Sequence, residues 1–142
     1  MHERLLQFIW QHRYYSAASL CTTAGDPLII IRAGTFNIHQ GPDFQDALIR
    51  IRDTLWAGHI ELHVRSSDWI RHGHQTDPRY ANIILHVVWE DDLELTHLFP
   101  VVELRQRVPK WLLNRYAALM EDLSPIPCSR QIQVISPLQW QS

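Results

Sequence analysis

The sequence predicts an α+β (mixed α/β) fold in which a single central mixed sheet is flanked by helices. Strand-like stretches occupy the middle of the chain. Apolar and polar residues alternate through residues 47–52 and 56–65, and residues 83–89 are almost continuously apolar. Helical periodicity occurs at both ends, over residues 3–14 and after Pro109. Because strands and helices are interleaved along the chain, we expect the helices to pack on one sheet.

The length of the chain, 142 residues, suits one domain. We expect this domain to cover residues 1–123 and a Pro-containing tail to follow over residues 124–142. The tail carries Trp140 close to its end. A large apolar side chain in that place indicates that the tail docks on a further C-terminal region or on a partner chain. We therefore expect the sequence to be part of a longer protein.

The first quarter of the chain predicts two helices and a strand. Apolar side chains recur at helical spacing over residues 3–14, and Ser16 is a suitable cap for a second, short helix through Leu20. A Gly-Asp-Pro turn at residues 25–27 then leads into a short apolar strand over residues 28–31.

The next part of the chain predicts a pair of strands. Residues 33–44 contain Gly and Pro and are expected to be irregular. The strand over residues 47–52 is joined by a turn at residues 53–54 to a longer strand over residues 56–65. Side chains alternate between the two faces of a strand. In the longer strand, Ile60, Leu62 and Val64 therefore lie on one face and Glu61, His63 and Arg65 on the other.

The last predicted elements are two strands and two helices. Residues 66–82 are polar, and Ser67 or Asp68 is expected to cap a short helix. The apolar run 83–89 predicts a buried central strand, and residues 99–104 predict another. Pro109 suits the first position of a helix. The apolar stripe of that helix comprises Leu112, Tyr116, Leu119 or Met120, and Leu123.

The composition argues against several classes of protein. No apolar run reaches the roughly 18 residues that span a bilayer, so no membrane partner is expected. The N-terminus lacks the pattern of a signal peptide, which leaves the cytoplasm as the expected location. A net charge of −2 does not suit a general nucleic-acid coat protein, although a local basic cleft remains compatible with it. Cys21 and Cys128 are too few for a disulfide framework.

Two acidic motifs lie in the predicted strand pair. Pro42-Asp43 precedes the first strand, and Glu61-Leu62-His63 lies within the second. This spacing is similar to that of the PD-(D/E)XK nuclease superfamily. The similarity implies a restriction-endonuclease-like sheet in which Asp43, Glu61 and the carbonyl of Leu62 bind Mg²⁺ or Mn²⁺. His63 stands in place of the usual Lys and is expected to position or deprotonate water.

The alternation of faces leaves a second choice of ligand open. If the strand is regular from residue 43, Asp46 rather than Asp43 lies on the face of the strand arginines. A bend at Asp43 would remove the conflict. We expect the arginines to bind substrate phosphate. The structural alternative is a solvated strand face in which the same arginines pair with Glu61 and His63. The arginines are Arg50, Arg52 and Arg65.

Histidine is unusually frequent, with nine residues in the chain, and most of them lie between residues 39 and 86. His72 and His74 alternate in one segment, so both can face a transition metal. With Asp77 and one further histidine they predict a zinc site. The structural alternative is that these side chains cap turns. The further histidine is His63 or His86, and His86, alone in an apolar strand, otherwise suits a satisfied core position.

Three strings are distinctive in combination: GPDFQDALIRI, WAGHIELHVRSSDW and HGHQTDPRYANIILHVVWEDD. Together with the opening ERLLQFIWQHRYY and the late IPCSRQI, they resemble a bacterial family of unknown function, the domain-of-unknown-function family 2851. The resemblance covers nearly the whole chain. It implies that the chain is the N-terminal portion of a longer protein, and it carries no activity.

These observations lead to two hypotheses of different kinds. In the first, the chain is a divalent-metal-dependent nuclease or phosphodiesterase that uses Mg²⁺ or Mn²⁺ and acts on nucleic acid. In the second, it is a non-catalytic binding or assembly module whose histidine cluster is structural or holds zinc. The nature of the bound ion and the convergence of Asp43, Glu61 and His63 distinguish the two hypotheses.

Overall fold

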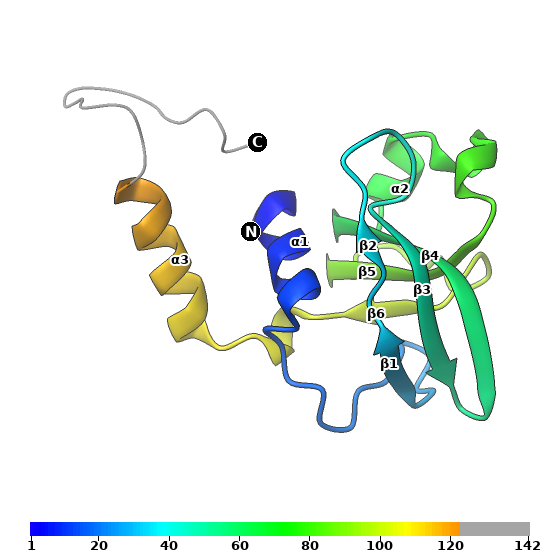
Figure 1. Ribbon diagram of the computed structural model, residues 1–142, viewed down its shortest axis with the longest axis horizontal. Coiled ribbons are helices and arrows are strands. Elements are labelled where there is room, and N and C mark those ends of the chain that lie inside the picture. Colours follow the sequence, from blue (N-terminus) through cyan, green and yellow to red (C-terminus); the bar gives the residue numbers. More distant parts are fainter. Residues whose placement is uncertain (123–142) are drawn as a thin grey trace.

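The structure is a computed structural model and describes residues 1–122 (Figure 1). The predicted tail, residues 124–142, lies outside the described residues, as do Leu123 and Cys128. Among the described residues, no helix combines the length and the apolar character that a membrane crossing requires.

The described chain contains three α-helices, three short 3-10 helices and six strands. The order of the elements agrees with the α+β fold that the sequence predicts. In chain order they are α1 (Glu3–His12), β1 (Leu28–Arg32), β2 (Thr35–Phe36), β3 (Phe44–Ile51), β4 (Thr54–Arg65), α2 (Asp68–Arg71), η1 (His74–Thr76), η2 (Pro78–Tyr80), β5 (Ile83–Glu90), β6 (Val101–Glu103), η3 (Arg105–Arg107) and α3 (Lys110–Asp122).

All six strands belong to one mixed sheet, with the order β1-β3-β4-β5-β6 and with β2 paired to β3. The pairs β1–β3 and β3–β4 are antiparallel, whereas β4–β5 and β5–β6 are parallel. The connection from β4 to β5 contains α2, η1 and η2, because parallel neighbours need a crossover rather than a tight turn. The prediction of a single central mixed sheet is confirmed.

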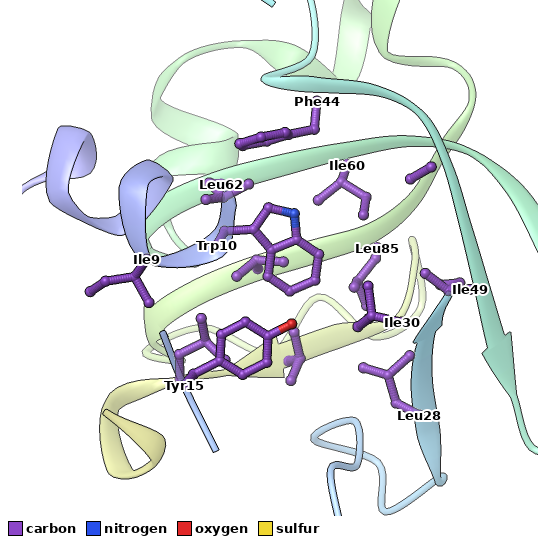
Figure 2. Packing of buried hydrophobic residues seen from close by; sticks show 14 of the residues in the cluster. Ile9, Trp10, Tyr15, Leu28, Ile30, Phe44, Ile49, Ile60, Leu62 and Leu85 are labelled. Carbon is purple, nitrogen blue, oxygen red and sulfur yellow. The ribbon is translucent and has the colours of Figure 1, made fainter. Parts of the chain in front are cut away.

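Helix α1 packs its apolar face against the sheet. Leu6, Ile9 and Trp10 are fully buried there. The Trp10 ring stacks on Tyr15 at a centroid distance of 5.5 Å, and its Nε1 donates to the carbonyl of Ala33 at 3.2 Å. Figure 2 shows the indole among apolar side chains of β4 and β5. This packing holds α1 against β4, so the first turn of the helix has a fixed position relative to the strands.

A second apolar cluster joins the crossover segment to the sheet. It consists of Trp69, Val88, Leu95, Phe99 and Val101. Val88 alternates along β5 with Val87, which belongs to the cluster under α1. Because successive side chains of a strand point to opposite faces, the two clusters cover opposite faces of the sheet.

The structure differs from three sequence predictions about local structure. Residues 16–20 form a turn rather than a helix, and Ser19 has a left-handed φ of 51°. The backbone groups at the ends of this segment bond across the fold, since Ser16 N donates to Arg107 O and Leu28 N donates to Leu20 O. Part of the irregular stretch 33–44 forms the short strand β2. The last strand is shorter than predicted, Val101–Glu103 instead of residues 99–104.

Strand β3 contains a bulge that decides which face Asp43 occupies. Phe44 pairs with Ile60 and Ala47 with Gly58, so β3 holds one more residue than β4 between these pairs. Asp46 lies in the bulge with a φ of 60°. Phe44 and Ala47 consequently both point into the core under α1. The neighbouring Asp43 then lies on the opposite face. A bulge at residues 45–46, rather than a bend at Asp43, removes the conflict of faces.

Candidate functional site

The side chains of Asp43 and Glu61 lie next to each other and are joined to the opposite strand segment by hydrogen bonds. The backbone N–H of Asp43 donates to Glu61 Oε1 at 3.0 Å, and the backbone N–H of Leu62 donates to Asp43 Oδ2 at 3.0 Å. The side chain of Gln7, from α1, donates to Asp43 Oδ1 at 3.3 Å. Each carboxylate therefore accepts an N–H from the opposite strand, which fixes both groups at the same end of the sheet.

Three imidazoles converge beside this pair. One ring nitrogen from each of His63, His72 and His74 lies within 4.8 Å of the other two, which is the spacing of a candidate metal site. The second oxygen of Glu61, Oε2, lies 3.1 Å from His74 Nε2 and 3.4 Å from His63 Nε2. Glu61 thus faces Asp43 with one oxygen and the imidazoles with the other.

The sequence His72-Gly73-His74 folds so that both histidines return to the sheet. His72 follows the last residue of α2, and Gly73 has a φ of 72°, a backbone conformation that glycine adopts easily. The chain reverses there and begins η1 at His74. The His74 ring stacks on Tyr80 at a centroid distance of 3.9 Å. His72 is exposed, so the site is open to solvent on this side.

A fourth histidine lies behind the site. His63 Nδ1 and His86 Nε2 are 2.8 Å apart, and both side chains are fully buried. His86 comes from β5, where it packs edge-on against Trp69 and Phe99. Within residues 1–122, neither His63 Nε2 nor His86 Nδ1 has a hydrogen-bond partner. The prediction of a satisfied core histidine therefore holds for only one of the two His86 nitrogens.

Burial shifts the pKa values of the acidic groups upward. The pKa of Asp43 rises to about 7, first because the group is buried and then because Glu61 is close. Burial raises the pKa of Glu61 to about 8, and Glu3 adds to this shift. Burial and the Asp43 charge raise the pKa of Glu3 to about 7. A bound cation would favour the ionised form of all three groups.

The buried histidines shift in the opposite direction. Burial lowers the pKa of His63, and the neighbouring His86 lowers it further. Burial also lowers the pKa of His86, to about 3. Desolvation disfavours the charged imidazolium, so both rings are neutral near pH 7. Neutral imidazole is the form that binds metal ions.

The structure brings together only some of the residues proposed from the sequence. Asp43, Glu61, His63, His72 and His74 converge, and the backbone of Leu62 binds Asp43. Asp46 is exposed in the bulge, where its backbone N–H donates to His59 Nδ1. Glu61 and His63 are buried, so the solvated strand face proposed as an alternative is not what they form. Asp77 accepts from Arg79 instead.

The three strand arginines do not meet at this site. Arg52 pairs with Asp26 at 2.6 Å, and Arg65 lies 3.7 Å from Glu90. Arg50 lies opposite Leu55 near the β3–β4 turn. Leu55 and Arg65 are ten residues apart on one strand. At about 3.3 Å per residue the two ends are about 33 Å apart, which is too far for one shared phosphate.

Two residues of α1 beside the site were not predicted from the sequence. Gln7 binds Asp43. Glu3 helps to raise the pKa of Glu61, and its own pKa is raised in part by Asp43. The signal that could have found them is their i, i+4 spacing, which places both on one face of the helix. It was not recognisable without the packing of α1 on the sheet.

A pocket of about 360 Å³ opens beside His74. Its walls include the aromatic side chains Trp69, Tyr80 and Phe99. The volume lies within the range of small-molecule binding sites. The histidine cluster therefore has space next to it for part of a substrate.

One comparison with known proteins places this chain in a family. The sequence model of the family described as "Protein of unknown function (DUF2851)" matches residues 3–142, so the chain belongs to this family. No curated protein and no solved structure matches the chain.

Proposed function

We propose that this DUF2851 chain carries a divalent-metal centre at the histidine cluster and that the centre hydrolyses phosphodiesters. The observation that carries the proposal is the convergence of the imidazoles of His63, His72 and His74. Two of them lie beside Oε2 of Glu61, whose other oxygen accepts the backbone N–H of Asp43. Imidazole and carboxylate groups in this number are typical of sites for transition metals.

The ligand set favours zinc or manganese over magnesium. In a tetrahedral site with metal–nitrogen distances of about 2.0–2.1 Å, the ligand nitrogens are about 3.4 Å apart. The nitrogens of His63, His72 and His74 lie within 4.8 Å of one another, so a small rotation of the exposed His72 would complete the set. The oxygen set of Asp43, Glu61 and the Leu62 carbonyl is the alternative, and it would suit Mg²⁺ or Mn²⁺.

Burial assigns different roles to the residues of the site. When bound, the ion would acidify a water molecule and polarise a phosphoryl oxygen. His63 is fully buried and bonded to His86, which suits a ligand better than a base that must exchange protons with solvent. Glu61 Oε2 lies beside two imidazoles and is positioned to take the proton of the water. Asp43 holds Glu61 in place through its backbone N–H.

The order of the elements supports phosphodiesters as the substrate class. Helix α1 precedes the strands, and Asp43 directly precedes β3. Glu61 and His63 lie on the antiparallel β4, and a crossover with α2 leads to the parallel β5. This order agrees with the restriction-endonuclease-like arrangement that the Pro-Asp and Glu-x-His spacing implies. Nucleic acid is therefore the proposed substrate.

The direct test is metal content and nuclease activity of the full chain. The purified protein is analysed for bound metals and is then assayed on single- and double-stranded DNA and RNA with Zn²⁺, Mn²⁺ or Mg²⁺. We expect metal-dependent cleavage that falls at least about 100-fold in Glu61→Gln, because a catalytic proton acceptor contributes 10²–10⁴-fold. Glu94→Gln is the control, since Glu94 is exposed and its carboxylate accepts a hydrogen bond from Thr96 Oγ1. Cleavage that survives in Glu61→Gln, or that needs no divalent ion, contradicts the proposal.

A second candidate function rests on the position of Glu61 Oε2. At 3.1 and 3.4 Å from two imidazole nitrogens, this oxygen can serve as a fourth ligand and close the site. Closed four-ligand zinc sites are structural rather than catalytic. Stoichiometric zinc in a chain that cleaves none of the four nucleic-acid substrates would favour this non-catalytic module.

A further inference from the structure

Two buried histidines share one hydrogen bond behind the proposed metal centre, and this bond links their ring protons. His63 Nδ1 and His86 Nε2 are 2.8 Å apart, so one nitrogen carries the hydrogen and the other accepts it. The remaining ring nitrogens, His63 Nε2 and His86 Nδ1, make no hydrogen bond within the described part of the chain. The proton arrangement of one ring therefore determines that of the other.

A neutral pair has two possible arrangements. In the first, His86 Nε2–H donates to His63 Nδ1, and His63 must carry its own hydrogen on Nε2. In the second, His63 Nδ1–H donates to His86 Nε2, and His63 Nε2 has a free lone pair. Only the second arrangement allows Nε2 to bind a metal ion, because a protonated ring nitrogen has no lone pair to offer.

His63 Nε2 is the nitrogen that faces the site. It lies 3.4 Å from Glu61 Oε2, the oxygen that also approaches His74 at 3.1 Å. Its side chain is 1% exposed, and the atom has no hydrogen-bond partner among residues 1–122. A buried polar nitrogen without a partner is costly, and an ion at the imidazole cluster would satisfy it.

We propose that His86 is a positioning residue for the metal centre: it accepts the Nδ1 proton of His63 and so fixes the tautomer in which Nε2 binds the ion. The inference rests on the proposed function, because it assumes an ion at the imidazole cluster. Metal-binding histidines generally donate their second N–H to a carboxylate, carbonyl or water. Here a second histidine takes that place, and the parallel pairing of β4 and β5 holds it there.

His86 lies among aromatic side chains on the far side of its bond to His63. Its ring packs edge-on against Trp69 and Phe99, which are buried. Water has no access to the fully buried His86 ring. If His86 is replaced by an apolar residue, the Nδ1–H that metal binding requires on His63 would be left buried without an acceptor.

The test compares His86→Phe with His86→Gln in the full chain. Phe keeps an aromatic ring but offers no acceptor, whereas the Gln amide can present an oxygen near the position of Nε2. Removing such an outer partner typically costs 10–100-fold in metal affinity. By competition with a chelator, we expect His86→Phe to bind Zn²⁺ about 10–100-fold more weakly than wild type. His86→Gln should recover most of the affinity, and His97→Phe, at an exposed position, should match wild type.

The outcomes separate this inference from the proposed function. If wild type binds none of the tested ions, the metal centre itself is contradicted. If wild type binds zinc and His86→Phe binds it equally well, the positioning role of His86 is wrong and the metal centre stands. Fold integrity is checked by urea unfolding of each variant in EDTA.

A measurement on the wild-type chain tests the tautomer without any substitution. In the zinc-bound protein, ¹⁵N chemical shifts of the imidazoles should show His63 protonated at Nδ1 and metal-bound at Nε2. The same spectrum should show His86 protonated at Nδ1. A His63 ring that binds zinc through Nδ1, or that keeps its hydrogen on Nε2, overturns the proposal.

Discussion

At the scale of single residues, Asp46 has the most consequential backbone conformation. It is one of the non-glycine residues with a positive φ in the described chain, and it lies at the centre of the β3 bulge. Its carbonyl accepts from Arg32 Nε and its N–H donates to His59 Nδ1. Both bonds use backbone atoms, so the identity of the side chain matters mainly through φ.

We expect Asp46→Val to be less stable than Asp46→Gly by about 1–2 kcal/mol, because the left-handed region is costly for a residue with a Cβ and worst for a branched one. The two variants are compared by urea unfolding. The same pair at Leu48, in regular strand, should show the reverse order, since Val suits a strand better than Gly. Equal stability of the two Asp46 variants would show that the positive φ at residue 46 costs a branched side chain nothing.

The residues of the site were predictable to different degrees. Glu61 and His63 share a face by strand alternation, which is a local property of the sequence. Asp43 was proposed from the Pro-Asp motif against that alternation, and its position depends on the bulge in β3. The hydrogen bond between His63 and His86 was not predicted, since it depends on which nitrogen of each ring faces the other across β4 and β5. Strand assignment alone carries no such information.

At the scale of elements, the contact between β4 and the start of β5 depends on a glycine. A Cβ at Gly58 would lie 2.6 Å from Ile84 Cγ2 and 2.7 Å from the carbonyl oxygen of Asn82. That carbonyl accepts the N–H of His59 at 2.9 Å, which begins the pairing of the two strands. The close approach leaves no room for any side chain at residue 58.

We expect Gly58→Ala to lower the free energy of unfolding by about 1–3 kcal/mol, the usual cost of overpacking. The alanine would push β5 away from β4 at the end where the two strands begin to pair. Chemical unfolding with urea measures the effect, and Ala57→Val is the neighbouring control because Ala57 is exposed. A Gly58→Ala variant as stable as wild type would show that the strands separate without cost.

The helices and strands whose apolar residues recur with a clear period were predicted well, whereas the irregular segments were not. Apolar periodicity identified α1, β3, β4 and β5, since each buries one or both faces. Residues 16–20 have a helix-capping sequence but form a turn, because their backbone groups bond to Leu28 of β1 and to Arg107. Tertiary bonds of this kind override local propensity.

At the scale of the whole molecule, the buried ionisable groups make stability depend on pH. The pKa values of Glu61, Asp43 and Glu3 are raised to about 8, 7 and 7 in the folded chain, above those of unfolded carboxyl groups. The folded state therefore binds more protons than the unfolded state up to about pH 8, and stability falls as the pH rises through this range. His63 and His86 act in the opposite sense, but only below about pH 6.5, where the unfolded histidines become charged.

We therefore expect the free energy of unfolding in EDTA to fall as the pH rises from about 6.5 to 8.5, because the raised pKa values of the carboxyl groups act there while the opposing contribution of the histidines fades. Glu61→Gln removes one of the ionising groups, so its decline should be shallower. Urea unfolding at a series of pH values measures both slopes. A wild-type stability that is flat or rises over this range would contradict the shifted pKa values.

Metal binding should stabilise the whole chain. An ion that binds only the folded state at 100 times its Kd adds about 2.7 kcal/mol to the free energy of unfolding. We expect Zn²⁺ to raise the thermal midpoint of the wild-type chain. The thermal midpoint of His72→Ala should hardly change on addition of Zn²⁺, since that variant loses the exposed ligand. His97→Ala is the surface control. An equal shift in His72→Ala would remove this histidine from the ligand set.

The arrangement of the whole sheet was predictable in class but not in detail. The mixed sheet follows from a strand pair, a crossover and a buried run, and the observed sheet has this form. The three strand arginines do not form the predicted phosphate site, because Arg50 and Arg65 lie near opposite ends of the β3–β4 hairpin. Side-chain alternation gives the face of a strand, whereas position along the hairpin depends on its register.

The extra residue in β3 also affects how related chains are recognised. Asp43 faces Glu61 because of the number of residues between Phe44 and Ala47, and loss of one residue there would turn the carboxylate toward the core. A search that requires only an acidic residue before the strand would accept such a chain. A search that counts the residues from that acid to the first paired apolar position would reject it. The site therefore depends partly on the number of residues in this segment of β3. An alignment gap there would indicate that the acidic side chain has moved to the other face of the strand.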